Sequence, residues 1–270
     1  MVSPAPKVTV SACGRPFLVH DVPRLASLCL GGLGSHERNG TSPLNRAARR
    51  ALARHWSQIA LMEHASVAAF ARFTLELLAL GAPADLLEAS QRALGDEIAH
   101  ARLCFDLASR YAGRRVSAGT LSLEGALDAA PTRRDIVRRA FLEACIGETQ
   151  ATAEAEAALL GACDPEVVAA LTRIAADEAR HAELGFRFVA WTLETAPPAE
   201  RQSLRDELAA LLDAQLAEQP PSLSSTVTAE LGQHGLLPEY TLRNARRRAL
   251  EDVVAPCAAA LGITHRSCAA

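Results

Sequence analysis

Two pentapeptides of one pattern, D-E-x-x-H, constrain the fold of this chain more than any other feature. They are Asp96-Glu97-Ile98-Ala99-His100 and Asp177-Glu178-Ala179-Arg180-His181, and each lies inside a long, alanine-rich stretch. On a helix, residues three apart share a face about one turn apart, so each pentapeptide directs a carboxylate and an imidazole the same way. That pair of side chains suits a hard or borderline metal ion. One E-x-x-H is expected by chance, whereas two with a preceding aspartate indicate a metal site.

The composition is that of a globular protein and excludes several classes of partner. Of the 270 residues, 49% are hydrophobic, which is enough to bury a sizeable core. The net charge of −3 and the aromatic content of 4% argue against a nucleic-acid-binding surface. No apolar run reaches the roughly 18 residues of a membrane span. We therefore expect neither nucleic acid nor a membrane as a partner.

The seven cysteines are scattered along the chain, and none forms a C-x-x-C pair. This spacing indicates neither a disulfide framework nor a thiolate metal site, and it favours a reducing, cytoplasmic location. Cys104 and Cys145 flank the candidate site and could line a substrate pocket. Small core residues are the favoured interpretation of both.

Capping signals and hydrophobic periodicity predict four long helices. Thr41-Ser42-Pro43 starts the first, with room for a break around Arg54–Ser57, and Gly81-Ala82-Pro83 ends it. The other three are predicted at about residues 85–111, 132–160 and 164–194. Thr132 and Asp135 resemble a capping box at the start of the third of the four helices, and Asp164 is expected to cap the fourth. The connections between the four are short, long and short, which is the pattern of a four-helix bundle with one central crossover.

Two further segments flank this predicted bundle of residues 41–195. Residues 1–40 are expected to be irregular, with Val8–Ala12 and Phe17–Val19 able to pair as a short β-hairpin. Residues 196–270 contain two more predicted helices, at about 200–218 and 241–261, which pack on the bundle. The predicted fold class is therefore all-α.

The two predicted helical hairpins repeat each other. Glu63 lies one helix before Glu97, and Glu148 lies one helix before Glu178, with spacings that differ by about one helical turn. Each glutamate lies in an apolar stripe, where an ionised carboxylate is severely unfavourable unless it is paired or bound to metal. On the third helix Glu148 is preferred because Glu143 has the poorer apolar face. The competing acids there are Glu143, Glu154 and Glu156.

The ordered set E…DExxH…E…DExxH resembles the ferritin-like di-iron or di-manganese carboxylate proteins, over about residues 45–195. The resemblance implies a ferritin-like bundle with a dinuclear metal site, whose ligands also carry the catalysis. Carried over to this chain, those ligands are Glu63, Glu97, His100, Glu148, Glu178 and His181.

The resemblance also implies a role for each member of the set. Glu97 and Glu178 would bridge the two ions, and each ion would be completed by the remaining glutamate and histidine of one hairpin. Asp96 and Asp177 resemble carboxylates that bind the free ring nitrogen of a ligand histidine and fix the orientation of its ring.

Two neighbouring residues are weaker candidates. His64 adjoins Glu63 but points about 100° away around the helix, so a solvated or hydrogen-bonded histidine is favoured over an extra ligand. Tyr111 lies on the same side as Glu97 near the helix end, where packing is favoured over a redox role.

The resemblance implies chemistry with O2 or peroxide at two Fe ions, with Mn as the alternative metal. The favoured function is an oxidase or oxygenase that acts on a small organic substrate and takes electrons from an external donor. The alternative is a ferroxidase or peroxide-detoxifying protein that handles iron or manganese. The extensions on both sides of the bundle favour the first function, because a minimal storage bundle needs neither. Assembly into a homo-oligomer is compatible with both.

Overall fold

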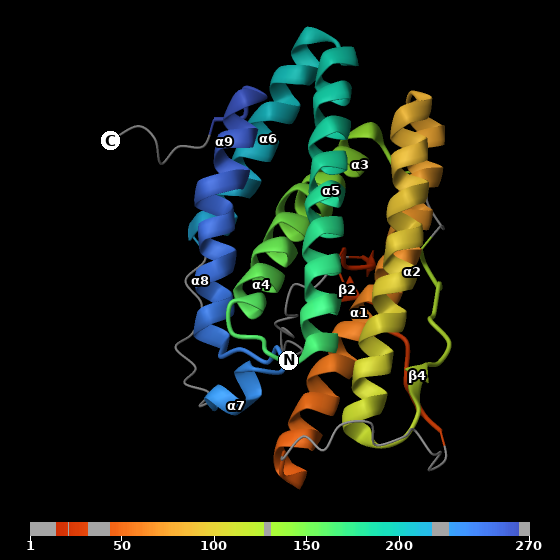
Figure 1. Ribbon diagram of the computed structural model, residues 1–270. Helices are drawn as coiled ribbons and strands as arrows, with labels where there is room; N and C mark the ends of the chain where they lie inside the picture. The colour runs from red at the N-terminus through yellow and green to blue at the C-terminus, as the bar shows by residue number, and fades with distance from the viewer. Residues whose placement is uncertain (1–14, 21, 32–43, 127–130, 218–226, 265–270) are drawn as a thin grey trace, which may run out of the picture.

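The computed structural model describes residues 15–20, 22–31, 44–126, 131–217 and 227–264, which are mostly helical. Long helices run side by side along the molecule, and short strands lie beside them (Figure 1). None of the described helices is both long enough and apolar enough to cross a membrane.

The first hairpin consists of α1 (Arg46–Leu80) and α2 (Ala84–Ala112), which pack along each other. Asn45 caps α1 by accepting a hydrogen bond from the Ala48 backbone N–H at 2.9 Å. The start expected at Thr41-Ser42-Pro43 lies outside the described residues. No break occurs around Arg54–Ser57, because the α-helix is continuous there. Gly81 ends α1 in the left-handed conformation, with φ of 67°.

The third helical segment is not the uniform α-helix that the sequence predicts. It begins with α3 (Arg133–Ala140), continues as a π-helix over Phe141–Glu148, and ends with α4 (Thr149–Leu159). The capping box predicted at its start is confirmed, since Thr132 and Asp135 each accept a hydrogen bond from the backbone N–H of the other. Wide turns of this kind occur often at functional sites.

Helix α5 (Pro165–Thr195) packs on α4, on the π-helix and on α2. Its cap is Asp164, whose side chain accepts from the backbone N–H groups of Glu166 and Val167. Gly185 allows the close approach to the π-helix, because a Cβ at this position would lie 2.7 Å from that of Ala144.

The C-terminal part contains α6 (Pro198–Ala217), α7 (Ala229–Gly232), α8 (Glu239–Ala249) and α9 (Ala255–Ala260). A second π-helix, Leu250–Val254, joins the last two. It directly precedes the first turn of α9, where Pro256 has no N–H to continue the α-helical pattern. Helix α8 packs on α4. The sequence predicts a helix at each end of this part but does not predict α7.

The described residues include four short strands besides the helices. Strand β1 (Leu18–Val19) pairs with β2 (Val22–Pro23), and β3 (Leu28–Leu30) pairs with β4 (Val116–Ala118), both antiparallel. The expected hairpin partner Val8–Ala12 lies outside the described residues. The sequence does not predict β4, which lies in the long connection between the helical hairpins.

The apolar core of the described residues has two large parts, one towards each end of the long helices, and a small third cluster in which Phe17 and Val19 pack on α1. On α1, Trp56 and Ala60 belong to one part, and Phe70 and Phe73 belong to the other. Helices α2 and α5 and the third helical segment also contribute to both parts. Glu63 lies between the two parts on α1, and the other three segments carry buried acidic residues at the corresponding level.

Candidate metal centre

Six buried side chains from four helical segments meet between the two parts of the core. Their ligand atoms form two groups, and within each group all of these atoms lie within 4.8 Å of one another. One group consists of Glu63, Glu97, His100 and Glu178, and the other of Glu97, Glu148, Glu178 and His181. The shared members are the two glutamates of the D-E-x-x-H pentapeptides. The six residues that the sequence nominates therefore lie together in the structure.

The cluster contains buried polar atoms that have no hydrogen-bond partner. Eight of the atoms are buried without a hydrogen-bond partner: both carboxylate oxygens of Glu63, Glu97 and Glu148, Oε1 of Glu178, and Nδ1 of His100. Leaving so many polar atoms unpaired in a core is very unfavourable. Carboxylate oxygens and imidazole nitrogens are also the donors that iron and manganese accept. The cluster therefore fits a pair of metal ions.

The outer nitrogen of each imidazole is held by an aspartate from the opposite pentapeptide. Nε2 of His100 lies 2.9 Å from Oδ2 of Asp177, and Nε2 of His181 lies 3.4 Å from Oδ2 of Asp96. These contacts turn the Nδ1 atoms inward. Such carboxylate partners fix both the tautomer and the ring orientation of a ligand histidine.

Arg180 links the two aspartates, a contact that the sequence analysis does not anticipate. Its Nη2 donates to Asp177 at 2.6 Å and to Asp96 at 3.1 Å. The sequence does contain one signal of this contact, because Asp177 and Arg180 are three residues apart and so share a helix face. The arginine thus completes a chain of polar contacts from the cluster to the surface, where 56% of its side chain is exposed.

Burial and mutual contact shift the pKa values of the cluster strongly. Burial raises the pKa of Glu63 to about 8. Burial also raises the pKa of Glu148 well above its usual range, and the nearby charges of Glu178 and Glu97 add to this. For His181, burial lowers the pKa, but the hydrogen bonds to Asp96 and Glu178 and the nearby carboxylate of Glu97 outweigh this effect and raise the pKa to about 12. Without metal, the cluster therefore binds protons, and their positive charge offsets the negative charge of the buried carboxylates.

Glu143, a competitor of Glu148 at the sequence level, is bound elsewhere. Its two oxygens lie 3.1 Å from Nε of Arg15 and 3.1 Å from Nη2 of Arg72. Both residues belong to the π-helix, but the Glu143 carboxylate pairs with the two arginines whereas the Glu148 carboxylate joins the cluster. Glu154 is 2.9 Å from Arg246.

The remaining candidates lie outside the cluster. His64 belongs to neither group of ligand atoms. The Tyr111 hydroxyl lies 2.9 Å from Nδ1 of His234 and accepts a hydrogen bond from Arg110. Cys104 and Cys145 are buried in different parts of the core and do not line the pocket described next.

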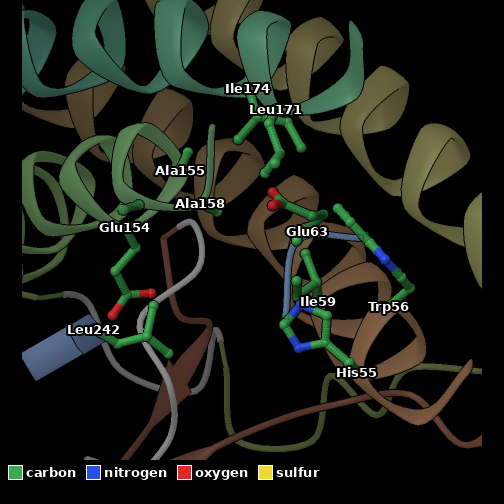
Figure 2. A pocket seen from close by; sticks show the side chains of 12 residues that line it. His55, Trp56, Ile59, Glu63, Glu154, Ala155, Ala158, Leu171, Ile174 and Leu242 are labelled. Carbon is green, nitrogen blue, oxygen red and sulfur yellow. The ribbon is translucent and has the colours of Figure 1, made fainter. Parts of the chain in front are cut away.

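A pocket opens onto Glu63 from the side of α8. The empty space in and in front of it, open solvent included, is about 490 Å³. Figure 2 shows the Glu63 carboxylate in the middle of the view, with Leu171 and Ile174 on one side and Ile59 on the other. The lining residues are His55, Trp56, Ile59, Glu63, Ala151, Glu154, Ala155, Ala158, Leu171, Ile174, Gly235 and Leu242. The sequence analysis does not predict this pocket, whose wall combines four helices and a loop.

No protein-family model, curated protein or solved structure matches this chain. What can be said of its function therefore comes from its own residues. The described part of the chain is a mostly helical protein with a buried carboxylate and histidine cluster that can hold metal ions, and with an apolar pocket beside that cluster.

Proposed function

We propose that this protein is a non-haem di-iron oxidase or oxygenase with a ferritin-like four-helix bundle. Helices α1, α2 and α5 and the segment from α3 to α4 would form the bundle, with the long connection through β4 as its single crossover. The packing of α1 on α2 and of α4 on α5 supports this arrangement. The repeated ligand pattern of the two hairpins also supports it.

Each ion would have its own pair of ligands and would share two more. Glu63 and His100 would hold one ion, and the equivalent pair of the second hairpin, Glu148 and His181, would hold the other. Glu97 and Glu178, which belong to both groups of ligand atoms, would be available to both ions. Manganese offers the same preference for oxygen and nitrogen donors, so the donor set alone does not distinguish it from iron.

Two ferrous ions in this site would supply the electrons that reduce O2. The residues of the chain have other tasks. Asp96 and Asp177 hold the histidine rings with Nδ1 facing inward, which fixes the direction of the ligand nitrogen. The apolar residues on both sides of the cluster exclude water and so protect reactive species from side reactions.

The pocket beside Glu63 is the observation that favours oxidation of an organic compound over iron handling. Its walls are chiefly aliphatic and aromatic, as in sites for small organic ligands. A route for hydrated iron would instead need carboxylates or water along its length. Glu154 is the acidic residue of the lining besides Glu63, and Arg246 already neutralises it.

The proposal is tested by loading the protein with Fe(II) under anaerobic conditions, removing free iron and admitting O2 with a chemical reductant. We expect O2 uptake over many turnovers, coupled to oxidation of an added small organic compound. If uptake scales only with added Fe(II) and never couples to an organic compound, the protein is a ferroxidase. Assembly into a 24-subunit shell that mineralises iron would lead to the same conclusion.

A further inference from the structure

The pocket beside Glu63 differs in character along its length. Close to the glutamate its walls are side chains of Ile59, Leu171 and Ile174, together with alanines of α4. His55 and Leu242 lie further from the Glu63 carboxylate (Figure 2), and Gly235 is also part of the lining. A molecule that enters would therefore contact hydrocarbon side chains at the end nearest the metal ligands and the imidazole of His55 at the other end.

The pocket is unsuited to anions. No lysine or arginine is among the described residues that line it. His55 is neutral near pH 7, because burial lowers its pKa to about 4 despite a contact with the Gly235 backbone. The other ionisable side chains of the lining are the acids Glu63 and Glu154, which offer no positive charge. A carboxylate or phosphate would thus lose its hydration without gaining a cation, which is very unfavourable.

His55 provides one unused polar contact. Its Nε2 atom is buried and has no hydrogen-bond partner, and its ring packs edge-on against Trp56 at a centroid distance of 5.4 Å. A neutral imidazole nitrogen either donates or accepts, depending on the tautomer. A hydroxyl group satisfies either tautomer, because it can do both.

We propose that this pocket binds a small uncharged molecule that is apolar apart from one hydroxyl group, with the hydroxyl at His55 and the hydrocarbon facing Glu63. The role of this molecule as substrate rests on the proposed oxygenase function. Binding of the molecule does not depend on that function, because the contacts that select it are made by the pocket and not by the metal ions.

Three probes of similar shape test the binding. Cyclohexanol carries the hydroxyl, methylcyclohexane replaces it with a methyl group, and cyclohexanecarboxylate carries a negative charge. Saturation-transfer NMR on the metal-free protein would give their dissociation constants. We expect cyclohexanol to bind roughly three- to tenfold more tightly than methylcyclohexane, the difference made by one net hydrogen bond. We expect no binding of the carboxylate.

Variants assign the binding to this pocket. Ala158→Phe and the milder Ala155→Leu fill it and should weaken cyclohexanol binding at least tenfold, whereas Ala176→Phe on the exposed face of α5 should not. His55→Phe should abolish the preference for cyclohexanol over methylcyclohexane. Circular dichroism confirms folding, and if a filled variant does not fold, the His55→Phe comparison decides alone.

The inference is overturned if cyclohexanol binds undiminished to the folded filled variants. It is also overturned if the preference for the hydroxyl survives in His55→Phe, or if the carboxylate binds as well as the alcohol. Elemental analysis of the same preparations keeps the two proposals separate. Two bound metals with no alcohol binding would contradict this inference alone, and alcohol binding without any metal uptake would contradict the proposed function alone.

Discussion

Nε2 of His100 on α2 lies 2.9 Å from Oδ2 of Asp177 on α5, so the first pentapeptide depends on the second for the position of its histidine. The reverse contact, from His181 to Asp96, is longer at 3.4 Å. Each aspartate therefore serves the histidine of the other hairpin. This exchange ties α2 to α5 at the level of the cluster.

Asp177→Asn should weaken metal binding about 10- to 100-fold, the usual effect of removing a carboxylate that orients a ligand histidine. Asp96→Asn should have a smaller effect, because its contact with His181 is longer. Competition with a chelator of known affinity would measure both. Asp106→Asn on the exposed face of α2 is the matched control. Equal affinity in Asp177→Asn and this control would contradict the orienting role.

We expect about two metal ions per chain, because each of the two groups of ligand atoms would hold one ion. The double variant Glu97→Ala and Glu178→Ala removes both shared carboxylates and should abolish metal binding. Elemental analysis after dialysis measures the content. Full retention of metal in the double variant would refute the site.

Metal should also stabilise the fold, because the ligands are brought together only in the folded state. Free metal at a hundred times its dissociation constant would add about 2.7 kcal/mol per bound ion to the free energy of unfolding. Denaturant titrations with metal and after chelation would measure the difference. The double glutamate variant should show none of it, and a difference that persists in the variant would place the stabilising metal elsewhere.

Arg15→Ala should destabilise the protein by about 3–5 kcal/mol, as removal of one partner from a buried ion pair does. The Arg15 side chain is 1% exposed, pairs with Glu143 and lies over the Phe73 ring at 4.3 Å. Urea unfolding measures the change. Arg92→Ala, which removes an exposed arginine beside Glu88, should change the free energy of unfolding by less than about 1 kcal/mol. Similar values for the two variants would show that the buried pair contributes little.

His55 should make stability fall as the solution is acidified. Burial lowers its folded pKa to about 4 from the ordinary histidine value of 6.5, so the unfolded chain takes up the proton first as the pH falls. This stabilising contribution is complete above pH 6.5 and is lost as the pH falls towards 4. Between pH 7 and pH 5 the loss would be about 2 kcal/mol.

The comparison of wild type with His55→Gln isolates this effect from that of other titrating groups. The free energy of unfolding of the variant should fall less steeply between pH 7 and pH 5, by about the amount given above. Parallel pH profiles of the two proteins would show that His55 is accessible to protons in the folded state.

The sequence predicts the helices and the members of the cluster because both follow from local spacing. The i, i+3 relation of Glu97 to His100 is a property of one helix, and a carboxylate such as Glu63 stands out in an apolar stripe. The caps at Thr132 and Asp164 are equally local, and the structure contains both.

What the sequence does not predict depends on how distant segments pack. The π-helix between Phe141 and Glu148 places Glu143 against Arg15, which is far away in the chain. Likewise, the pocket forms only where His55 of α1 and Leu242 of α8 line the same space as residues of α4. Neither arrangement leaves a periodic signal, because each is decided by side chains that meet only after the helices have assembled.

The division of the core into two apolar parts has a consequence for how the molecule comes apart. A polar layer across a protein could separate two independently folding units. Here α1, α2, α5 and the third helical segment each contribute to both parts, whereas α6 and α9 contribute to one part alone. Melting either part would interrupt all four shared segments at the level of the cluster. Unfolding of these four segments should therefore be a single cooperative transition, and a metal bound in the layer would resist it along all four at once.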